Sequence, residues 1–175
     1  MYHYQNQPQL LRYRSSLRYN MNQTFNFYTQ YHQFYIGDKL SSAKVNLEDF
    51  WTDDAYEDRL AIEKELIGVR TQSYGNIKGE INILDVENTY IDTSKYDHIV
   101  EGGLIMESDT LVILDCPNTN IEFKIKINPG KYRVRIYSSN LKSVVEDEGD
   151  DYYKIEIWPD SNMERKVLKQ YIPNK

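Results

Sequence analysis

The sequence has few of the residues that hold a small fold together covalently or through a metal. Among 175 residues it contains one cysteine, Cys116, and three histidines. A single thiol cannot form an internal disulfide, which favours a reducing compartment and hence the cytoplasm. No H-x-x-x-H or C-x-x-C pair occurs. We therefore expect neither a dedicated metal site nor a bound cofactor.

Long apolar runs and phosphate-binding motifs are also missing. No apolar run reaches the roughly 18 residues of a membrane-spanning helix, so we expect no membrane insertion. The first 20 residues lack the apolar core of a signal peptide. The chain has no P-loop, G-x-G-x-x-G or G-x-S-x-G motif. Gly102-Gly103 lies in a strand-like stretch, where the pair indicates a bulge rather than a phosphate cradle.

The groups that could perform catalysis are isolated from one another. His32 and His98 are far apart in the sequence and fall in predicted strands. Cys116 follows Asp115, whose negative charge disfavours a reactive thiolate. We therefore expect no catalytic residues and a protein that is not an enzyme. A hydrolase that combines two carboxylates with His32 or His98 remains an alternative.

Charge is distributed unevenly along the chain, although the net charge is only −6. Residues 1–47 contain five basic side chains and one acidic one, a net charge of +4. The remainder contains 16 basic and 26 acidic side chains, a net charge of −10. An acidic body repels nucleic acid and attracts basic proteins, so we expect a basic protein partner and no direct contact with nucleic acid. Alternatively, the charge serves solubility alone.

The residue pattern predicts a mostly β fold, a single-domain antiparallel β-sandwich with one short helix near residues 53–64. Residues 1–22 are predicted to be an extension, loose or weakly helical, and residues 23–175 a β-sandwich binding domain. The segment from Thr24 to Ile36 interleaves aromatic and polar residues, as one strand does. Further strands are predicted at Leu66–Ser73, Lys78–Val86, His98–Glu107, Leu111–Leu114, Ile121–Ile127, Tyr132–Ser138 and Tyr153–Trp158, with a strand or helix at Arg165–Tyr171.

A helix is predicted from Asp53 to Lys64. Thr52 is a favourable N-cap residue, and Asp53 and Asp54 in the first turn suit the helix dipole. Trp51, Ala55, Ile62 and Leu66 recur near helical spacing.

A hairpin is predicted around the turn at residues 128–131, which contains Pro129 and Gly130. Apolar residues alternate with basic ones on both sides of this turn, so the hairpin would have one apolar and one basic face. The basic residues are Lys124, Lys126, Arg133 and Arg135. They could form a nucleic-acid stripe, or they could pair with nearby carboxylates.

Two acidic groups are the candidate partner-binding surfaces. Five carboxylates surround Gly149 without the ligand spacing of an EF-hand. Such a run is typically extended and solvated, but it could also mimic phosphate in a basic groove. Tyrosine and tryptophan beside it could anchor an interface. The predicted partner-binding residues are Asp53, Asp54, Glu57, Asp58, Glu146, Asp147, Glu148, Asp150, Asp151, Tyr152, Tyr153 and Trp158.

Three short motifs together resemble the competence protein J family, the DNA-entry nuclease inhibitors. They are Tyr31-His32-Gln33-Phe34, Trp51-Thr52-Asp53-Asp54-Ala55 about twenty residues later, and a turn from Pro129 to Tyr132. The resemblance covers roughly Phe25 to Trp158. The extension before Met21 and the acidic run at 146–151 depart from the family pattern.

The resemblance implies a non-enzymatic inhibitor or immunity-type protein that binds and restrains a nuclease or toxin. An acidic inhibitor suits this role, because a nuclease must present a basic cleft to DNA. A sugar- or ligand-binding β-sandwich that uses surface tyrosines is the main alternative, and an assembly module is another. The sequence does not determine the oligomeric state.

Overall fold

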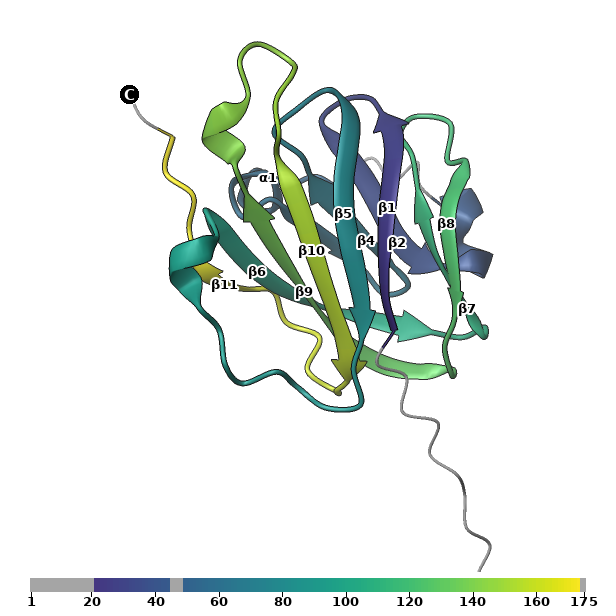
Figure 1. The fold of residues 1–175 in the computed structure, drawn as a ribbon. Coiled ribbons are helices and arrows are strands. Elements are labelled where there is room, and N and C mark those ends of the chain that lie inside the picture. The colour runs from purple at the N-terminus through teal and green to yellow at the C-terminus, as the bar shows by residue number, and fades with distance from the viewer. Residues whose placement is uncertain (1–20, 45–48, 174–175) are drawn as a thin grey trace, which may run out of the picture.

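A computed structural model describes residues 21–44 and 49–173 of the chain. Two sheets pack face to face as a β-sandwich (Figure 1). The predicted extension at residues 1–22 lies outside the described residues, except that the first strand already begins at Met21. Within the described ranges, no helix is long and apolar enough to cross a membrane.

One sheet has six strands in the order β1-β5-β10-β9-β6-β11. Its neighbours are antiparallel except β5 and β10, which run parallel. Its strands are β1 (Met21–Thr29), β5 (Gly75–Ile83), β6 (His98–Met106), β9 (Gly130–Ser139), β10 (Tyr152–Pro159) and β11 (Lys166–Lys169).

The other sheet has five antiparallel strands in the order β3-β4-β2-β7-β8. These are β2 (Gln33–Asp38), β3 (Leu60–Glu63), β4 (Leu66–Arg70), β7 (Thr110–Leu114) and β8 (Ile121–Lys126). Within the described residues, the helical elements are α1 (Asp53–Glu57) and three 3₁₀ turns, η1 (Lys39–Lys44), η2 (Thr93–Lys95) and η3 (Leu141–Ser143).

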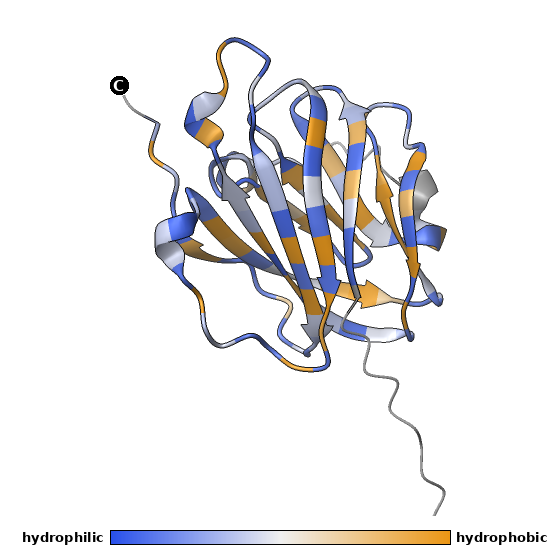
Figure 2. Cartoon of the chain, viewed as in Figure 1, coloured by the Kyte–Doolittle hydropathy of each residue, from blue (hydrophilic) through white to orange (hydrophobic). Residues whose placement is uncertain are grey.

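The core lies between the two sheets. Apolar and polar residues alternate along the strands (Figure 2), and the apolar ones of both sheets meet in one cluster. In β5, Ile77 and Ile81 are fully buried while Lys78 is exposed. Phe27 and Phe34 meet edge to face across the sandwich with ring centroids 5.9 Å apart. The period-2 pattern therefore predicted the apolar faces well.

The predicted strand from Thr24 to Ile36 is wrong as a single strand. The chain turns at Gln30–His32, where Tyr31 and His32 have φ of 57° and 53°, and it then enters the other sheet as β2. Nothing in Gln30-Tyr31-His32 is a typical turn residue, so the sequence pattern did not reveal this crossover.

The predicted helix is confirmed at its start and wrong at its end. The Thr52 hydroxyl accepts a hydrogen bond from the Ala55 amide at 3.1 Å, and α1 begins at Asp53. The helix ends at Glu57, and Arg59 is left-handed, with φ of 59°. Leu60 then begins β3, because pairing with β4 buries Leu60 and Ala61 on opposite faces of the sheet.

The predicted hairpin and the predicted bulge are also wrong. β8 pairs with β7, whereas β9 pairs with β6 and β10, so residues 127–129 cross between the sheets. Gly102 pairs with Val134 and Gly103 with Arg133 in unbroken register. The glycines instead allow side chains of neighbouring segments to pack directly against the β6 backbone. A Cβ on Gly102 would lie 2.5 Å from the Cδ1 atom of Ile62.

Candidate partner-binding surface

One end of the sandwich gathers three connections that are far apart in the sequence. β1 and β9 end there, and β5 and β10 begin there; this end is at the top of Figure 1. The connections are residues 30–32, 71–74 and 140–151. The Thr71 amide donates to the His32 carbonyl at 2.8 Å, and the Tyr74 amide donates to the Asp147 carbonyl at 2.8 Å. The three connections therefore form one continuous surface.

The acidic run is exposed, as expected, but it forms a folded loop rather than the extended chain that its charge predicted. Glu146, Asp147, Glu148 and Asp150 are exposed. Val145 and Glu148 form a backbone bridge. The Asp150 amide donates to the Ser143 hydroxyl at 2.8 Å, and Leu141 is buried beneath. These contacts hold the carboxylates in a folded loop.

Asp151 was predicted to bind the partner, but its side chain is buried and only 3% exposed. Its carboxylate accepts hydrogen bonds from the amides of Gln72 and Ser73, from the Ser73 hydroxyl and from the Tyr153 hydroxyl. A buried carboxylate with this many donors is a structural group. Asp151 therefore supports the surface from below and cannot contact a partner.

Two of the predicted aromatic anchors are likewise interior residues. Tyr153 is fully buried against Phe34, and burial raises the pKa of its hydroxyl. Trp158 is 3% exposed and lies under the guanidinium of Arg135, 4.7 Å from the ring centroid. Tyr152 is half-buried, and its hydroxyl lies 3.4 Å from Glu80. Only Tyr152 remains available at the surface.

The acidic face of α1 is only partly free. Asp53, Asp54 and Glu57 are exposed. Asp58 pairs with Arg165, with Nε and Oδ2 2.7 Å apart. On the other side, Arg70 stacks over the Tyr56 ring at 3.7 Å. Basic side chains on both sides thus offset the negative charge of this face.

Sequence reasoning missed a group of aromatic residues beside the acidic loop, in which Tyr28 and Tyr31 are exposed and His32 and Tyr74 are partly buried. We call Tyr28, Tyr31, His32, Tyr74 and Asp147 the tyrosine cluster. The rings of Tyr31 and Tyr74 are 6.3 Å apart, and those of His32 and Tyr74 are 5.5 Å apart. His32 Nε2 lies 3.8 Å from Asp147 Oδ1. Partial burial, then Tyr28, Tyr31 and Asp147, raise the pKa of Tyr74. The only available signal was the motif beginning Tyr31-His32 that carried the family resemblance.

The other candidate groups are structural. His98 is buried, and its Nδ1 accepts from the Tyr171 amide at 3.2 Å while its Nε2 lies 2.9 Å from the Asp58 carbonyl. Burial lowers the pKa of His98 to about 4. Cys116 is buried. Across residues 21–44 and 49–173, no three His, Cys, Asp or Glu side chains could jointly hold a metal ion.

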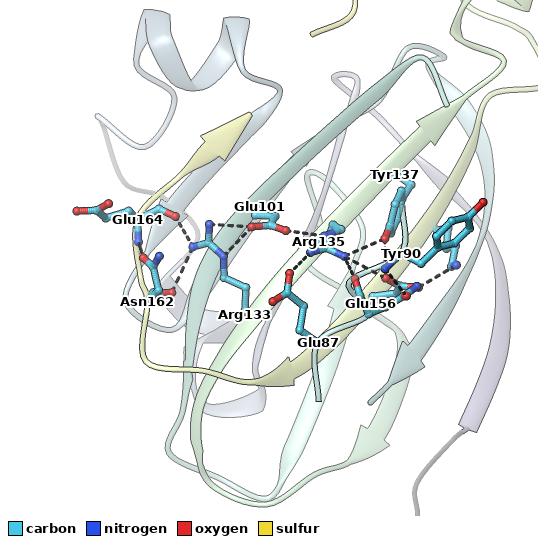
Figure 3. A network of polar contacts seen from close by, with 11 residues as sticks. Glu87, Tyr90, Glu101, Arg133, Arg135, Tyr137, Glu156, Asn162 and Glu164 are labelled. Carbon is cyan, nitrogen blue, oxygen red and sulfur yellow. Dashed lines mark hydrogen bonds and ion pairs between the residues drawn. The ribbon is translucent and has the colours of Figure 1, made fainter. Parts of the chain in front are cut away.

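The predicted basic stripe does not exist as a surface. Lys124 and Lys126 are exposed on β8, but Arg133 and Arg135 are buried on the other sheet. Figure 3 shows both arginines bound to Glu101 between them. Pairing with nearby carboxylates, the other interpretation of these residues, is therefore confirmed for the two arginines and for Lys126, whose Nζ lies 2.6 Å from Asp109 Oδ1.

Two segments cover these arginines on the outer face of the six-stranded sheet. Arg135 also binds Glu87 and the Asn88 carbonyl, in the connection between β5 and β6. Arg133 also binds the carbonyls of Asn162 and Glu164, in the segment after β10 (Figure 3). We call Glu101, Arg133, Arg135, Tyr137 and Glu156 the covered ion network.

Comparison with known proteins relates the fold, and not a sequence family, to other chains. No family model matches the sequence, and no curated protein does. A solved structure described as ComJ from Bacillus subtilis, inhibitor of the DNA degrading activity of NucA, matches with a TM-score of 0.61 and 17% identity, over 79% of this chain and 96% of ComJ. One described as crocagin biosynthetic gene J matches with a TM-score of 0.52 and 19% identity, over 81% and 99%. The chain therefore has a ComJ-like fold.

Proposed function

We propose that this protein is a non-enzymatic inhibitor that binds a nuclease and restrains it through an acidic surface. The fold shared with ComJ, over nearly all of that protein, is the observation that carries the proposal. The carboxylates of the 146–150 loop support it, since they are exposed and held in place. A single buried thiol suits action in the cytoplasm.

The mechanism follows from the chemistry of nucleases. An enzyme that binds DNA needs a basic cleft for the phosphates. Carboxylates on a folded loop can occupy that cleft without being cleaved, and their field accelerates the encounter. Inhibition then requires only tight binding, with no reaction on the inhibitor.

The test is binding and inhibition with two nucleases, NucA and the nuclease encoded nearest to this chain's own gene. Binding is measured at low and at physiological salt, and DNA degradation is followed in parallel. We expect tight binding to at least one nuclease, weaker binding at higher salt, and loss of DNA degradation. If neither nuclease binds or loses activity, the proposal is wrong.

The sugar-binding alternative stays a prediction. Tyr56 on α1 and Tyr90 between β5 and β6 lie outside the tyrosine cluster. Within the cluster, the rings of Tyr31 and Tyr74 meet edge to face and do not form the flat stacking platform that a sugar needs, so the arrangement does not favour sugar binding over the inhibitor.

A further inference from the structure

We infer that the tyrosine cluster anchors the interface with a basic protein partner by binding an arginine-rich part of the partner's surface. The inference rests on the proposed function for its basic partner and adds the residues that bind it. Exposed aromatic faces beside a carboxylate are the chemistry that recognises a guanidinium, because the ring attracts the cation and the carboxylate pairs with it.

The cluster presents two of its rings to solvent. Tyr31 is 62% exposed and Tyr28 is 53% exposed. The ring of Tyr31 lies 6.3 Å from that of Tyr74, and Tyr28 is near enough to help raise the pKa of Tyr74. Tyr is enriched among the residues that dominate interfaces. Asp147 lies at the edge of the cluster through its 3.8 Å contact with His32.

The backbone beneath the cluster is held by hydrogen bonds to buried groups. The His32 ring nitrogen Nδ1 lies 3.1 Å from the Gln72 carbonyl. The Gln72 amide in turn donates to the buried Asp151 carboxylate and to the Tyr153 hydroxyl. Tyr31 and His32 both adopt left-handed backbone conformations, each at a cost of about 1–3 kcal/mol. A surface fixed in this way loses little entropy on binding.

Charge selects this part of the end surface over the α1 face. The three connections at 30–32, 71–74 and 140–151 contain one lysine and five carboxylates, a net charge of −4 with histidine neutral. Arg70 and Arg165 lie next to α1 instead. Arg70 directly precedes the 71–74 connection, but its guanidinium stacks on Tyr56, and Arg59, which binds the Gln72 side chain, is buried. The protein already uses the proposed contact internally, since Arg70 stacks on Tyr56 at 3.7 Å.

A deca-arginine peptide and a deca-lysine peptide are the probes that test the cluster without a nuclease. Titration of the full chain is followed by two-dimensional NMR. We expect the largest shifts at residues 31, 32, 74 and 147, with tighter binding of deca-arginine, because guanidinium stacks on rings better than ammonium does. Shifts centred on α1, or equal binding of both peptides, would overturn the inference.

Variants separate the rings from the charge. Tyr31→Asn removes a ring but suits the left-handed backbone, so folding is retained, and together with Tyr74→Leu it should weaken deca-arginine binding about 10-fold. Tyr31→Phe keeps the ring and should bind as the parent does. Tyr90→Ala is the matched control, since Tyr90 is 81% exposed and outside the three connections. Unchanged binding by the double variant contradicts the inference.

The nuclease assay distinguishes the two proposals. If a nuclease is inhibited and the double variant inhibits it equally well, the anchor is wrong while the inhibitor function stands. If deca-arginine maps to the cluster but neither nuclease binds, the function is wrong while the cluster remains a site for another basic protein.

Discussion

The covered ion network and the tyrosine cluster both combine tyrosine with carboxylates, yet the fold buries the first group and exposes part of the second. In the network, Arg135 is 1% exposed and bound on all sides by Glu101, Glu87, Asn88 and Tyr137. In the cluster, Tyr31 and Asp147 are exposed. Charges that satisfy one another and are buried stabilise or specify the fold. Those left exposed and oriented are available to a partner.

The largest expected effect is on the covered ion network. Glu101→Gln leaves Arg133 and Arg135 buried without their shared carboxylate, so we expect the free energy of unfolding to fall by about 3–5 kcal/mol. Urea unfolding measures this. The control is Glu107→Gln, which breaks the exposed pair with Lys64 and should change nothing measurable. A loss as small as that of the control would show that the network is not needed for stability.

His98 should make stability depend on pH. Burial lowers its pKa from 6.5 to about 4, so its contribution is complete above pH 6.5 and is lost as the pH falls towards 4. We expect the stability advantage of the parent over His98→Gln to shrink by about 3 kcal/mol across that range. Carboxylates titrate in both proteins and cancel in the difference. A difference that does not vary with pH would contradict this role.

Asp151 and Asp150 are adjacent in sequence but belong to different regions, which gives a direct test of the distinction. Asp151→Asn places a donor where four donors already converge, so we expect stability to fall by about 2 kcal/mol. Asp150→Asn should leave thermal unfolding unchanged. Equal melting of the two variants would mean that burial does not separate their roles.

The smallest expected effect is on association. Asp147→Asn and Asp150→Asn together should slow nuclease binding about threefold at low salt, because they remove exposed charge that steers a basic partner. Asp85→Asn is the control, since this exposed residue follows β5 at the opposite end of the sandwich. The test is stopped-flow or surface-based kinetics. If Asp85→Asn slows association as much as each of the two loop changes does, the effect comes from the total charge and not from a local surface.

Sequence reasoning predicted the strands better than their partners. From β4 to β11, every strand lies within a few residues of a predicted segment, because alternation is a local property. The crossover at Tyr31 and His32 was missed because it lacks glycine, proline and asparagine. The hairpin failed because the turn at Pro129 joins two sheets rather than two neighbouring strands.

The candidate site was predicted only in part. The exposed carboxylates of the 146–150 loop were identified from their charge alone. Tyr153 and Trp158 were taken as surface anchors, although both are buried, because a tyrosine or tryptophan in a strand suits either face. The cluster around Tyr74 was missed, since its members come from connections about forty residues or more apart.

By itself, the sequence determined that this chain forms a β-sandwich, because period-2 alternation does not depend on topology. Tertiary structure alone decided which polar residues are accessible. Arg133 and Arg135 are covered by segments at 87–88 and 162–164, and Asp151 by the amides of residues 72 and 73. Accessibility depends on such distant contacts, and no local pattern encodes them.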